Sequence, residues 1–197
     1  MKLAALILAG GRSQRMGQDK ALLEINGVPL LRHIWETAHT LTSTVWVATP
    51  HRDCYQSLLP LETRWIDEPL TPASVSLQGP LVVFSQALPA IDADWILLLA
   101  CDLPNLKAAS LDQWSRDLPG ISTAEIAYVP QTAQGWEPLC GFYRSSCLSS
   151  LRAYLATGQR SFQNWLNHSR IAVIADVPVD MLANCNTPAD WQRLTGS

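Results

Sequence analysis

Residues 95–101, with the sequence WILLLAC, form one of the two longest apolar runs in the chain and lead directly into Asp102. The run has the length of a strand and falls far short of the roughly 20 residues that cross a bilayer. Because no side chain on either face of this strand is polar, other parts of the protein must cover both faces. The run therefore predicts the central strand of a sheet that is covered on both sides.

Further apolar runs alternate with stretches of helical periodicity. The runs are Leu3–Leu8, residues 45–48, 65–66 and 126–129, and Ile171–Ile174; the helical stretches are residues 29–41, 145–156 and 161–167. Thr187 is suited to cap a last helix that has Pro188 and the acid Asp190 in its first turn. The alternation predicts an α/β fold of three layers, in which a largely parallel open sheet has helices on both faces. We find no linker or repeat, so residues 1–197 are expected to form one domain.

Charge and cysteine content restrict the partners and the compartment. The net charge is -3 and the Lys and Arg residues are scattered, so no basic stripe is available for nucleic acid. The sequence also lacks an apolar segment long enough for a membrane. Five cysteines, an odd number without a C-x-x-C pair, favour reduced thiols and a cytoplasmic protein.

The first apolar run enters a cationic, glycine-rich loop, in which residues 8–20 read LAGGRSQRMGQDK. Adjacent glycines let backbone N–H groups approach an anion or a planar base, and Arg12, Arg15 and Lys20 supply charge for a polyphosphate. The spacing matches neither the dinucleotide fingerprint G-x-G-x-x-G nor a P-loop. Open α/β sheets bind ligands at the carboxyl ends of their strands, so the loop predicts a nucleoside triphosphate site. The alternative is a solvated surface loop.

Acidic residues follow two of the predicted strands. Asp102 ends the buried run near the low-dielectric core, where a carboxylate needs a metal ion or a cation as its partner. Mg²⁺ suits this position because it takes one or two carboxylates together with substrate phosphates. A turn or helix-capping aspartate before Pro104 is the alternative. Asp67 and Glu68 end the strand at 65–66, at the same expected edge of the sheet. One of the two acids is a candidate to reach the nucleotide or a water in the outer coordination shell of the metal, and a solvated loop acid is the alternative.

The loop resembles the signature of the molybdenum cofactor guanylyltransferases, within the larger nucleotidyltransferase superfamily. Later segments resemble that family's other motifs in the same order: Gly79-Pro80-Leu81, Cys101-Asp102-Leu103-Pro104, Glu137-Pro138-Leu139 and Asn184-Cys185-Asn186-Thr187-Pro188. The resemblance covers essentially the whole chain. It implies a Rossmann-like nucleotidyltransferase fold.

The resemblance implies that GMP passes from GTP to the phosphate of molybdopterin, with or without molybdenum, and that pyrophosphate is released. Catalytic roles would fall to Arg15, Lys20 and Asp102, of which Asp102 would hold Mg²⁺. The nucleotide would contact Leu8, Ala9, Gly10, Gly11, Lys20, Asp67 and Asp102. Asp67 is preferred here to Glu68.

The resemblance also places Asn184 and Asn186 near the acceptor. If these two residues lie in a strand, their side chains point to one face, where the amides can donate to and accept from a pterin or a phosphate. Trp136 is the tryptophan that we expect to touch the acceptor. Accessory and acceptor proteins of molybdoenzyme maturation are the protein partners that the resemblance suggests.

Two departures from the family pattern leave other functions open. Ala48 stands where relatives often have an asparagine, which weakens the assignment of the base, and Val83 replaces a usual glycine, which bears on the approach to the acceptor. One rival is a cytidylyl- or sugar-phosphate nucleotidyltransferase. The other is a nucleotide-binding cofactor-delivery protein without turnover.

Overall fold

The computed structural model describes residues 1–10, 19–67, 79–185 and 187–195. The described strands are β1 (Leu3–Leu8), β2 (Glu24–Ile25), β3 (Val28–Pro29), β4 (Val45–Thr49), β5 (Arg64–Asp67), β6 (Trp95–Ala100), β7 (Ala127–Thr132), β8 (Gly135–Trp136), β9 (Cys140–Arg144) and β10 (Ile171–Ile174). The α-helices are α1 (Leu30–His39), α2 (Arg52–Tyr55), α3 (Gly79–Ala87), α4 (Ala108–Asp117), α5 (Leu148–Ala156), α6 (Phe162–Asn167) and α7 (Pro188–Thr195). Short 3₁₀ helices are η1 (Lys20–Leu22), η2 (Leu88–Ala90), η3 (Leu118–Gly120) and η4 (Ser145–Cys147).

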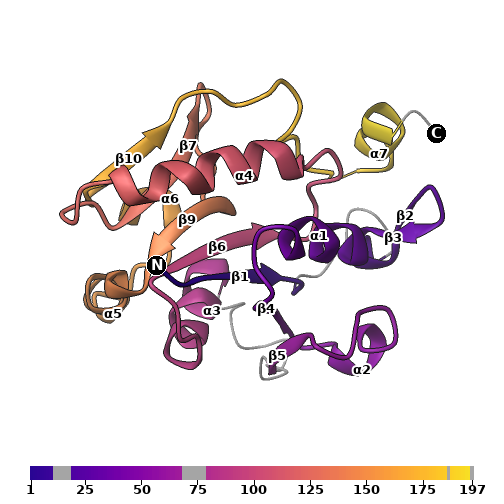
Figure 1. Cartoon of the computed structure of the whole chain (residues 1–197), viewed down its shortest axis with the longest axis horizontal. Helices are drawn as coiled ribbons and strands as arrows, with labels where there is room; N and C mark the ends of the chain where they lie inside the picture. Colours follow the sequence, from indigo (N-terminus) through magenta and orange to yellow (C-terminus); the bar gives the residue numbers. More distant parts are fainter. Residues whose placement is uncertain (11–18, 68–78, 186, 196–197) are drawn as a thin grey trace.

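The main sheet has eight of the described strands, in the order β10-β7-β9-β6-β1-β4-β5, with β8 paired to β7. Strands β5, β4, β1 and β6 are parallel neighbours, and β10 runs parallel to β7. Strand β9 runs antiparallel to both β6 and β7. The sheet is thus largely parallel, as predicted, and the parallel pairing brings the carboxyl ends of β1, β4, β5 and β6 to one edge. Figure 1 shows β1 and β6 side by side at the centre of the sheet.

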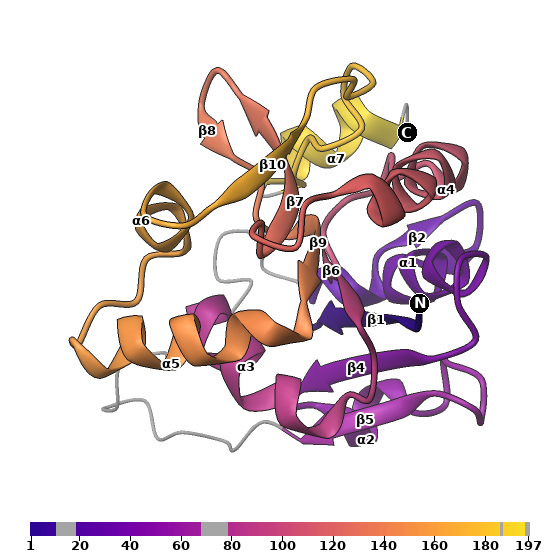
Figure 2. The same cartoon turned by 60° about the vertical axis from the view of Figure 1, so that its left-hand side comes forward.

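Alternate residues of the central strands enter two separate cores. Ala5 and Ile7 of β1 pack in a cluster with residues of α1, α2 and α4. Ala4 and Leu6 pack in a second cluster with residues of α3, α5 and α6. Figure 2 shows α1 and α4 on one side of the sheet and α3, α5 and α6 on the other. The period-two alternation of a strand thus gives a three-layer fold with helices on both faces, which confirms the predicted class.

Helix α1 illustrates how local sequence sets an element. The β2–β3 hairpin before it turns at Asn26 and Gly27, with φ of 52° and 77°, the conformation that an Asn-Gly turn favours. The helix then begins at Leu30, and its apolar stripe is fully buried against the sheet at Leu30, Leu31, Ile34 and Ala38. It lies inside the predicted stretch 29–41.

Most predicted elements occur close to their expected bounds. Strand β6 ends at Ala100, one residue before the end of the apolar run, and the stretch 145–156 divides into η4 and α5. The last helix, α7, begins after Thr187 as predicted: the Thr187 hydroxyl accepts from the Asp190 N–H at 3.1 Å, and the Asp190 carboxylate accepts from the Thr187 N–H at 2.9 Å. The sequence patterns did not indicate α3, α4 or β9.

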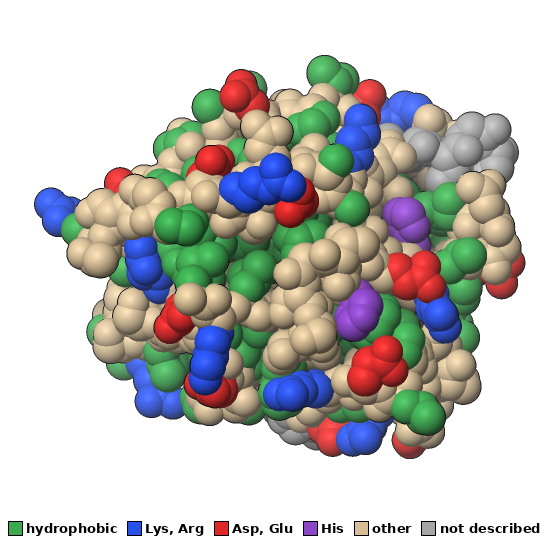
Figure 3. Space-filling model, in the orientation of Figure 1, with side chains coloured by type: hydrophobic (Ala, Val, Ile, Leu, Met, Phe, Trp, Pro, Cys, Tyr) green, Lys and Arg blue, Asp and Glu red, His purple; other side chains and the backbone are tan. Residues whose placement is uncertain are grey.

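The surface and the cysteines agree with the composition. In Figure 3, Lys and Arg side chains on the visible face are interspersed with Asp and Glu. Among the described residues, no helix has the length and apolarity that crossing a bilayer requires. All five cysteines are free thiols.

Candidate active site

The sheet brings predicted site residues from distant segments to one edge. Gly10 follows β1, Asp67 ends β5 and Asp102 follows β6, and these three strands end together because they are parallel. Gly10 is exposed there. The carboxyl edge of a parallel sheet is where α/β proteins bind ligands. Gly11 and Arg15 lie outside the described residues.

The backbone at the start of the glycine loop is anchored to both neighbouring strands. The Leu8 carbonyl accepts from the Cys101 N–H at 3.3 Å, and the Ala9 N–H donates to the Ala48 carbonyl at 2.9 Å. The buried Thr49 hydroxyl donates to the Ala9 carbonyl at 2.8 Å. Because the N–H of Ala9 is already engaged, any contact of Ala9 with a nucleotide falls to the second lone pair of its carbonyl.

Ala48 and Thr49 show how the departure from the family pattern is accommodated. The Ala48 side chain is fully buried in the core cluster under α3 and so takes no part in the surface at this edge. Thr49, the next residue, is the polar side chain of β4 that reaches the loop. Sequence reasoning did not single out Thr49, and its signal was the polar residue that ends an otherwise apolar strand.

Lys20 and Asp102 form the central contact of this edge. The Lys20 ammonium Nζ lies 3.2 Å from Oδ2 of Asp102, and the two side chains are 14% and 22% exposed. The two residues were assigned to phosphate and metal binding by independent arguments, and the fold places them side by side. An ion pair in such a partly buried position compensates both charges, and Oδ1 of Asp102 is not part of the contact.

Lys20 begins η1, and the residue before it fixes that turn. Oδ1 of Asp19 accepts from the Ala21 N–H at 3.0 Å, which is the bond of an N-cap. The second oxygen, Oδ2, accepts from the Tyr55 hydroxyl at 2.6 Å. Asp19 and Tyr55 were not among the predicted site residues. Asp19 stood next to Lys20 in the loop motif, whereas nothing in the sequence around Tyr55 marked it.

Asp67 lies at the same edge but on its outer side. Its carboxylate is 66% exposed and lies 3.4 Å from the Arg52 guanidinium of α2. Register places Asp67 beside Thr49 on β4. Glu68, the alternative acid, lies outside the described residues, so Asp67 and Glu68 are not distinguished by position.

A pocket of about 290 Å³ is lined by Leu103, the residue that follows Asp102. Its lining residues are Leu103, Gln134, Trp136, Glu137, Pro138, Leu139, Cys140, Gln163, Leu182 and Asn184. Three sequence motifs meet here, since Leu103 follows Asp102, Glu137 belongs to the Glu-Pro-Leu segment and Asn184 precedes the last helix. Pockets of this size with a few convergent polar groups are typical of small-molecule sites.

Helix α6 holds the tryptophan of this pocket in place. Gln163 accepts from the Trp136 N–H at 2.9 Å and donates to the Trp136 carbonyl at 2.6 Å. Asn167 accepts from the indole N–H at 2.8 Å. With its polar atoms engaged, Trp136 offers its ring to a ligand. Beside it, burial raises the pKa of the Glu137 carboxyl, partly offset by the Thr132 hydroxyl.

The segment before α7 is attached to the centre of the site. The Cys185 N–H donates to the Asp102 carbonyl at 3.1 Å, which brings Asn184 to the pocket wall. Residues 183–185 are not in a strand, so the alternation expected for the two asparagines does not apply. Asn186 lies outside the described residues.

The donor atoms at this edge fit a hard divalent cation. Among the described residues, no group of three or more His, Cys, Asp or Glu side chains could hold a metal by itself. Asp102 supplies a carboxylate, and Mg²⁺ needs only one or two carboxylates when substrate phosphates provide further oxygens. Burial and the nearby Asp102 raise the pKa of the Cys101 thiol to about 12, so this neighbour stays a neutral thiol.

Comparison with known families agrees with this geometry. The family model of the MobA-like NTP transferase domain matches residues 5–172. Molybdopterin-guanine dinucleotide biosynthesis protein A from Archaeoglobus fulgidus has a similar fold, with a TM-score of 0.76 and 19% identity over 98% of this chain and 97% of that chain. The matched family model and the fold make this chain a nucleotidyltransferase.

Two sequences identify the branch of the superfamily. The probable molybdenum cofactor guanylyltransferase of Synechococcus elongatus is 47% identical over 98% of this chain and 98% of its own length. The probable molybdenum cofactor guanylyltransferase of Nostoc is 43% identical over 98% of this chain and 91% of its own length. The chain belongs to the molybdenum cofactor guanylyltransferases, and the family predicted from the motifs is confirmed.

Proposed function

We propose that this enzyme transfers GMP from GTP to the terminal phosphate of molybdopterin, with or without bound molybdenum, and releases pyrophosphate. The observation that carries the proposal is the Lys20–Asp102 pair, 3.2 Å apart at the carboxyl edge of the sheet in a chain of the guanylyltransferase family. An ammonium and a carboxylate this close together suit a substrate that carries phosphates and a bound Mg²⁺, because the ammonium can pair with the phosphates and the carboxylate with the Mg²⁺.

GTP would occupy the edge beyond β1. Leu8, Ala9, Gly10 and Gly11 would face the base with backbone groups, and the exposure of Gly10 supports an approach there. Lys20 would meet the phosphates together with Arg15, whose position rests on the family motif. Asp67 would contact the nucleotide from β5, and its ion pair with Arg52 would orient the carboxylate.

Asp102 would hold Mg²⁺ through its carboxylate. When bound, Mg²⁺ would supply positive charge to the α-phosphate and to the departing pyrophosphate. The contribution of the chain is to keep the carboxylate in place: the Asp102 carbonyl is bonded to Cys185 and its Oδ2 to Lys20.

The acceptor would lie in the pocket between Trp136 and Asn184. A pterin is planar and has polar edges. Its plane could stack on the Trp136 ring, which is held in place by its indole N–H, and its edges could exchange hydrogen bonds with the Asn184 amide. Asn186 would act beside Asn184. Leu103, the residue after Asp102, lines the pocket, so an acceptor bound there would have Asp102 near its phosphate.

The reaction is a displacement at phosphorus. An oxygen of the acceptor phosphate attacks the α-phosphorus of GTP, a P–O bond forms, and the bond to pyrophosphate breaks with its electron pair on the leaving group. A phosphate is already ionised at neutral pH, so no general base has to remove a proton. Acceleration therefore rests on positioning and on cations near the developing charge.

Three broader assignments accompany the proposal. Residues 1–197 would act as one nucleotidyltransferase domain, since the site draws on both ends of the chain. The enzyme would work in the cytoplasm, in keeping with its free thiols. Its product would pass to accessory and acceptor proteins of molybdoenzyme maturation.

The direct test is product identification. The purified chain, GTP, Mg²⁺ and molybdopterin are combined, and the products are resolved by mass spectrometry. A guanine dinucleotide of molybdopterin together with pyrophosphate supports the proposal. Binding of GTP without a dinucleotide would instead identify a cofactor-delivery protein.

A further inference from the structure

Tyr55 makes a buried polar contact that neither the loop motif nor the proposed roles account for. It ends α2 and is 2% exposed, yet its hydroxyl lies 2.6 Å from Oδ2 of Asp19, 36 residues earlier. Burial raises the pKa of Tyr55, further raised by Asp19, so the phenol keeps its proton and donates. Hydrogen bonds to an ionised acceptor are among the stronger ones in proteins.

Asp19 connects this contact to the site. Its other carboxylate oxygen, Oδ1, accepts from the Ala21 N–H at 3.0 Å, and its carbonyl accepts from the Leu22 N–H at 3.1 Å. The carboxylate is therefore held at both oxygens, one by α2 and one by η1. Lys20 is the first residue of η1 and lies between Asp19 and Ala21 in the chain. Its ammonium Nζ lies 3.2 Å from Oδ2 of Asp102.

We propose that Tyr55 is a positioning residue for guanylyl transfer, whose hydroxyl holds the Asp19 carboxylate and thereby sets Lys20 beside Asp102 for contact with the nucleotide phosphates. This inference rests on the proposed function, since it assigns Lys20 to the phosphates. The chain of contacts runs from the tyrosine hydroxyl through one carboxylate and one short turn to the ammonium. Because the turn has only three residues, a shift of Asp19 moves the backbone from which Lys20 extends.

The ring and the hydroxyl of Tyr55 have separable functions. The ring packs in the core cluster with α1 and β4 residues, and this role is kept in Tyr55→Phe. Only the bond to Asp19 is lost in that variant. A positioning function therefore predicts an effect on catalysis, whereas a packing function predicts none.

The chain supplies a matched control. The hydroxyl of Tyr128 donates to Oδ2 of Asp117 at 3.0 Å, another partly buried tyrosine–aspartate pair. Tyr128 lies on β7 and Asp117 ends α4, and neither has a role in the proposed site. Tyr55→Phe is expected to lower kcat/KM for GTP about tenfold, and Tyr128→Phe less than twofold, at similar melting temperatures.

A double-mutant cycle tests whether Tyr55 acts through Lys20. GTP affinity is measured by titration calorimetry for the wild type, Tyr55→Phe, Lys20→Ala and the double variant, so that the result does not depend on residual turnover. Tyr55→Phe should weaken GTP binding severalfold when Lys20 is present. In the Lys20→Ala background, the same substitution should change GTP binding less than twofold. Asp19→Asn, which weakens the same bond from the other side, should match Tyr55→Phe.

The outcomes separate the inference from the function on which it rests. If the wild type neither binds GTP nor forms the dinucleotide, the proposed function is wrong. If the wild type is active and Tyr55→Phe equals it, or if Tyr55→Phe weakens binding equally with and without Lys20, the positioning role of Tyr55 is overturned.

Discussion

The ammonium of Lys20 lies 3.2 Å from Oδ2 of Asp102, although 82 residues separate the two in the chain. The contact joins the end of the central apolar strand to a short turn behind the glycine loop. We propose that Lys20 carries the charge for a phosphate and Asp102 the charge for a cation. A nucleoside triphosphate with bound Mg²⁺ can interact with both side chains, because its phosphates pair with an ammonium and its Mg²⁺ with a carboxylate.

Replacing Asp102 by asparagine should remove nearly all transfer activity and leave the fold intact. The amide keeps the size of the side chain but removes the charge that would hold Mg²⁺ and that faces Lys20. Loss of one well-placed charge should cost on the order of 3 kcal/mol in the barrier, or roughly 100-fold in rate. Pyrophosphate release and thermal unfolding are measured together. Normal magnesium-dependent turnover in this variant would remove Asp102 from the metal role.

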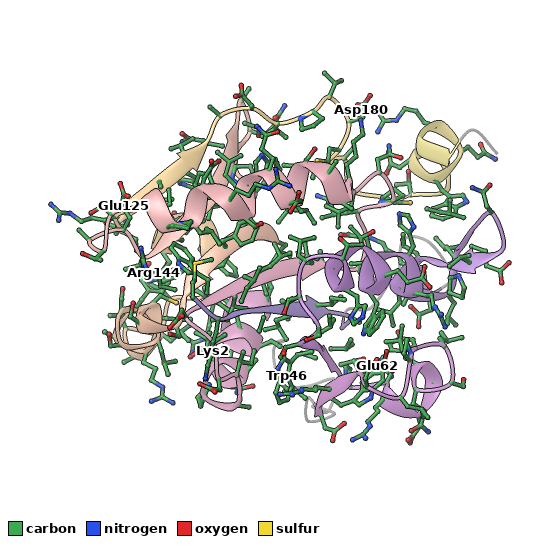
Figure 4. The ribbon with its side chains drawn as sticks, viewed as in Figure 1. Lys2, Trp46, Glu62, Glu125, Arg144 and Asp180 are labelled. Atoms are coloured by element: carbon green, nitrogen blue, oxygen red, sulfur yellow. The ribbon has the colours of Figure 1, made fainter. Side chains whose placement is uncertain are left out.

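Replacing Lys20 by alanine should weaken GTP binding and slow transfer, each by roughly tenfold or more, since a charge-assisted contact with the phosphates is lost. Lys2→Ala is the matched control, because Lys2 is exposed at the amino end of β1, opposite the site edge, and pairs with Asp92 (Figure 4). GTP affinity is measured by calorimetry and the rate by single turnover. Equal values for Lys20→Ala and Lys2→Ala would overturn the phosphate assignment.

Replacing Asn184 by alanine should raise KM for the acceptor about tenfold and leave KM for GTP unchanged, because Asn184 lines the pocket and not the glycine loop. Asn164→Ala, an exposed asparagine on α6 that does not line the pocket, is the control. Steady-state kinetics with each substrate varied in turn distinguish the two sites. An effect on GTP alone would place the acceptor elsewhere.

Replacing Glu137 by glutamine should stabilise the protein at neutral pH and change little at acidic pH. Burial raises the pKa of Glu137 in the folded state, so its ionisation costs folding free energy above that pKa and nothing below the unfolded pKa. The stability of the wild type relative to the variant therefore falls as pH rises through this interval. Urea unfolding at pH 4 and pH 7 measures the difference. A variant that is less stable at pH 7 would show that the carboxylate is held by a favourable contact.

The sequence predicted the class of fold because its strands are strongly apolar. The runs at Leu3–Leu8 and Ile171–Ile174 match β1 and β10 residue for residue, and the terminal helix follows its cap at Thr187. Helix α3 escaped detection because its residues, GPLVVFSQA, are apolar nearly all round and show no helical period. Helix α4 has the opposite difficulty, since only Leu111 and Trp114 of its ten residues are buried.

The candidate site could be predicted from the sequence where its residues lie within one segment. Lys20 and Asp102 were each indicated by their own motif, but their contact depends on the parallel pairing of β1 with β6. The Tyr55–Asp19 hydrogen bond and the pocket beside Trp136 are formed by segments far apart in the chain, and no local sequence pattern indicates such contacts. Arg15, Gly11 and Asn186 lie outside the described residues and remain predictions.

The most direct test of the central claim is pyrophosphate release from the purified protein with GTP, CTP, ATP or UTP, each with and without molybdopterin and Mg²⁺. We expect this enzyme to release pyrophosphate from GTP only when both molybdopterin and Mg²⁺ are present. Preference for CTP, or no release with any nucleotide and acceptor, would contradict guanylyl transfer as its function.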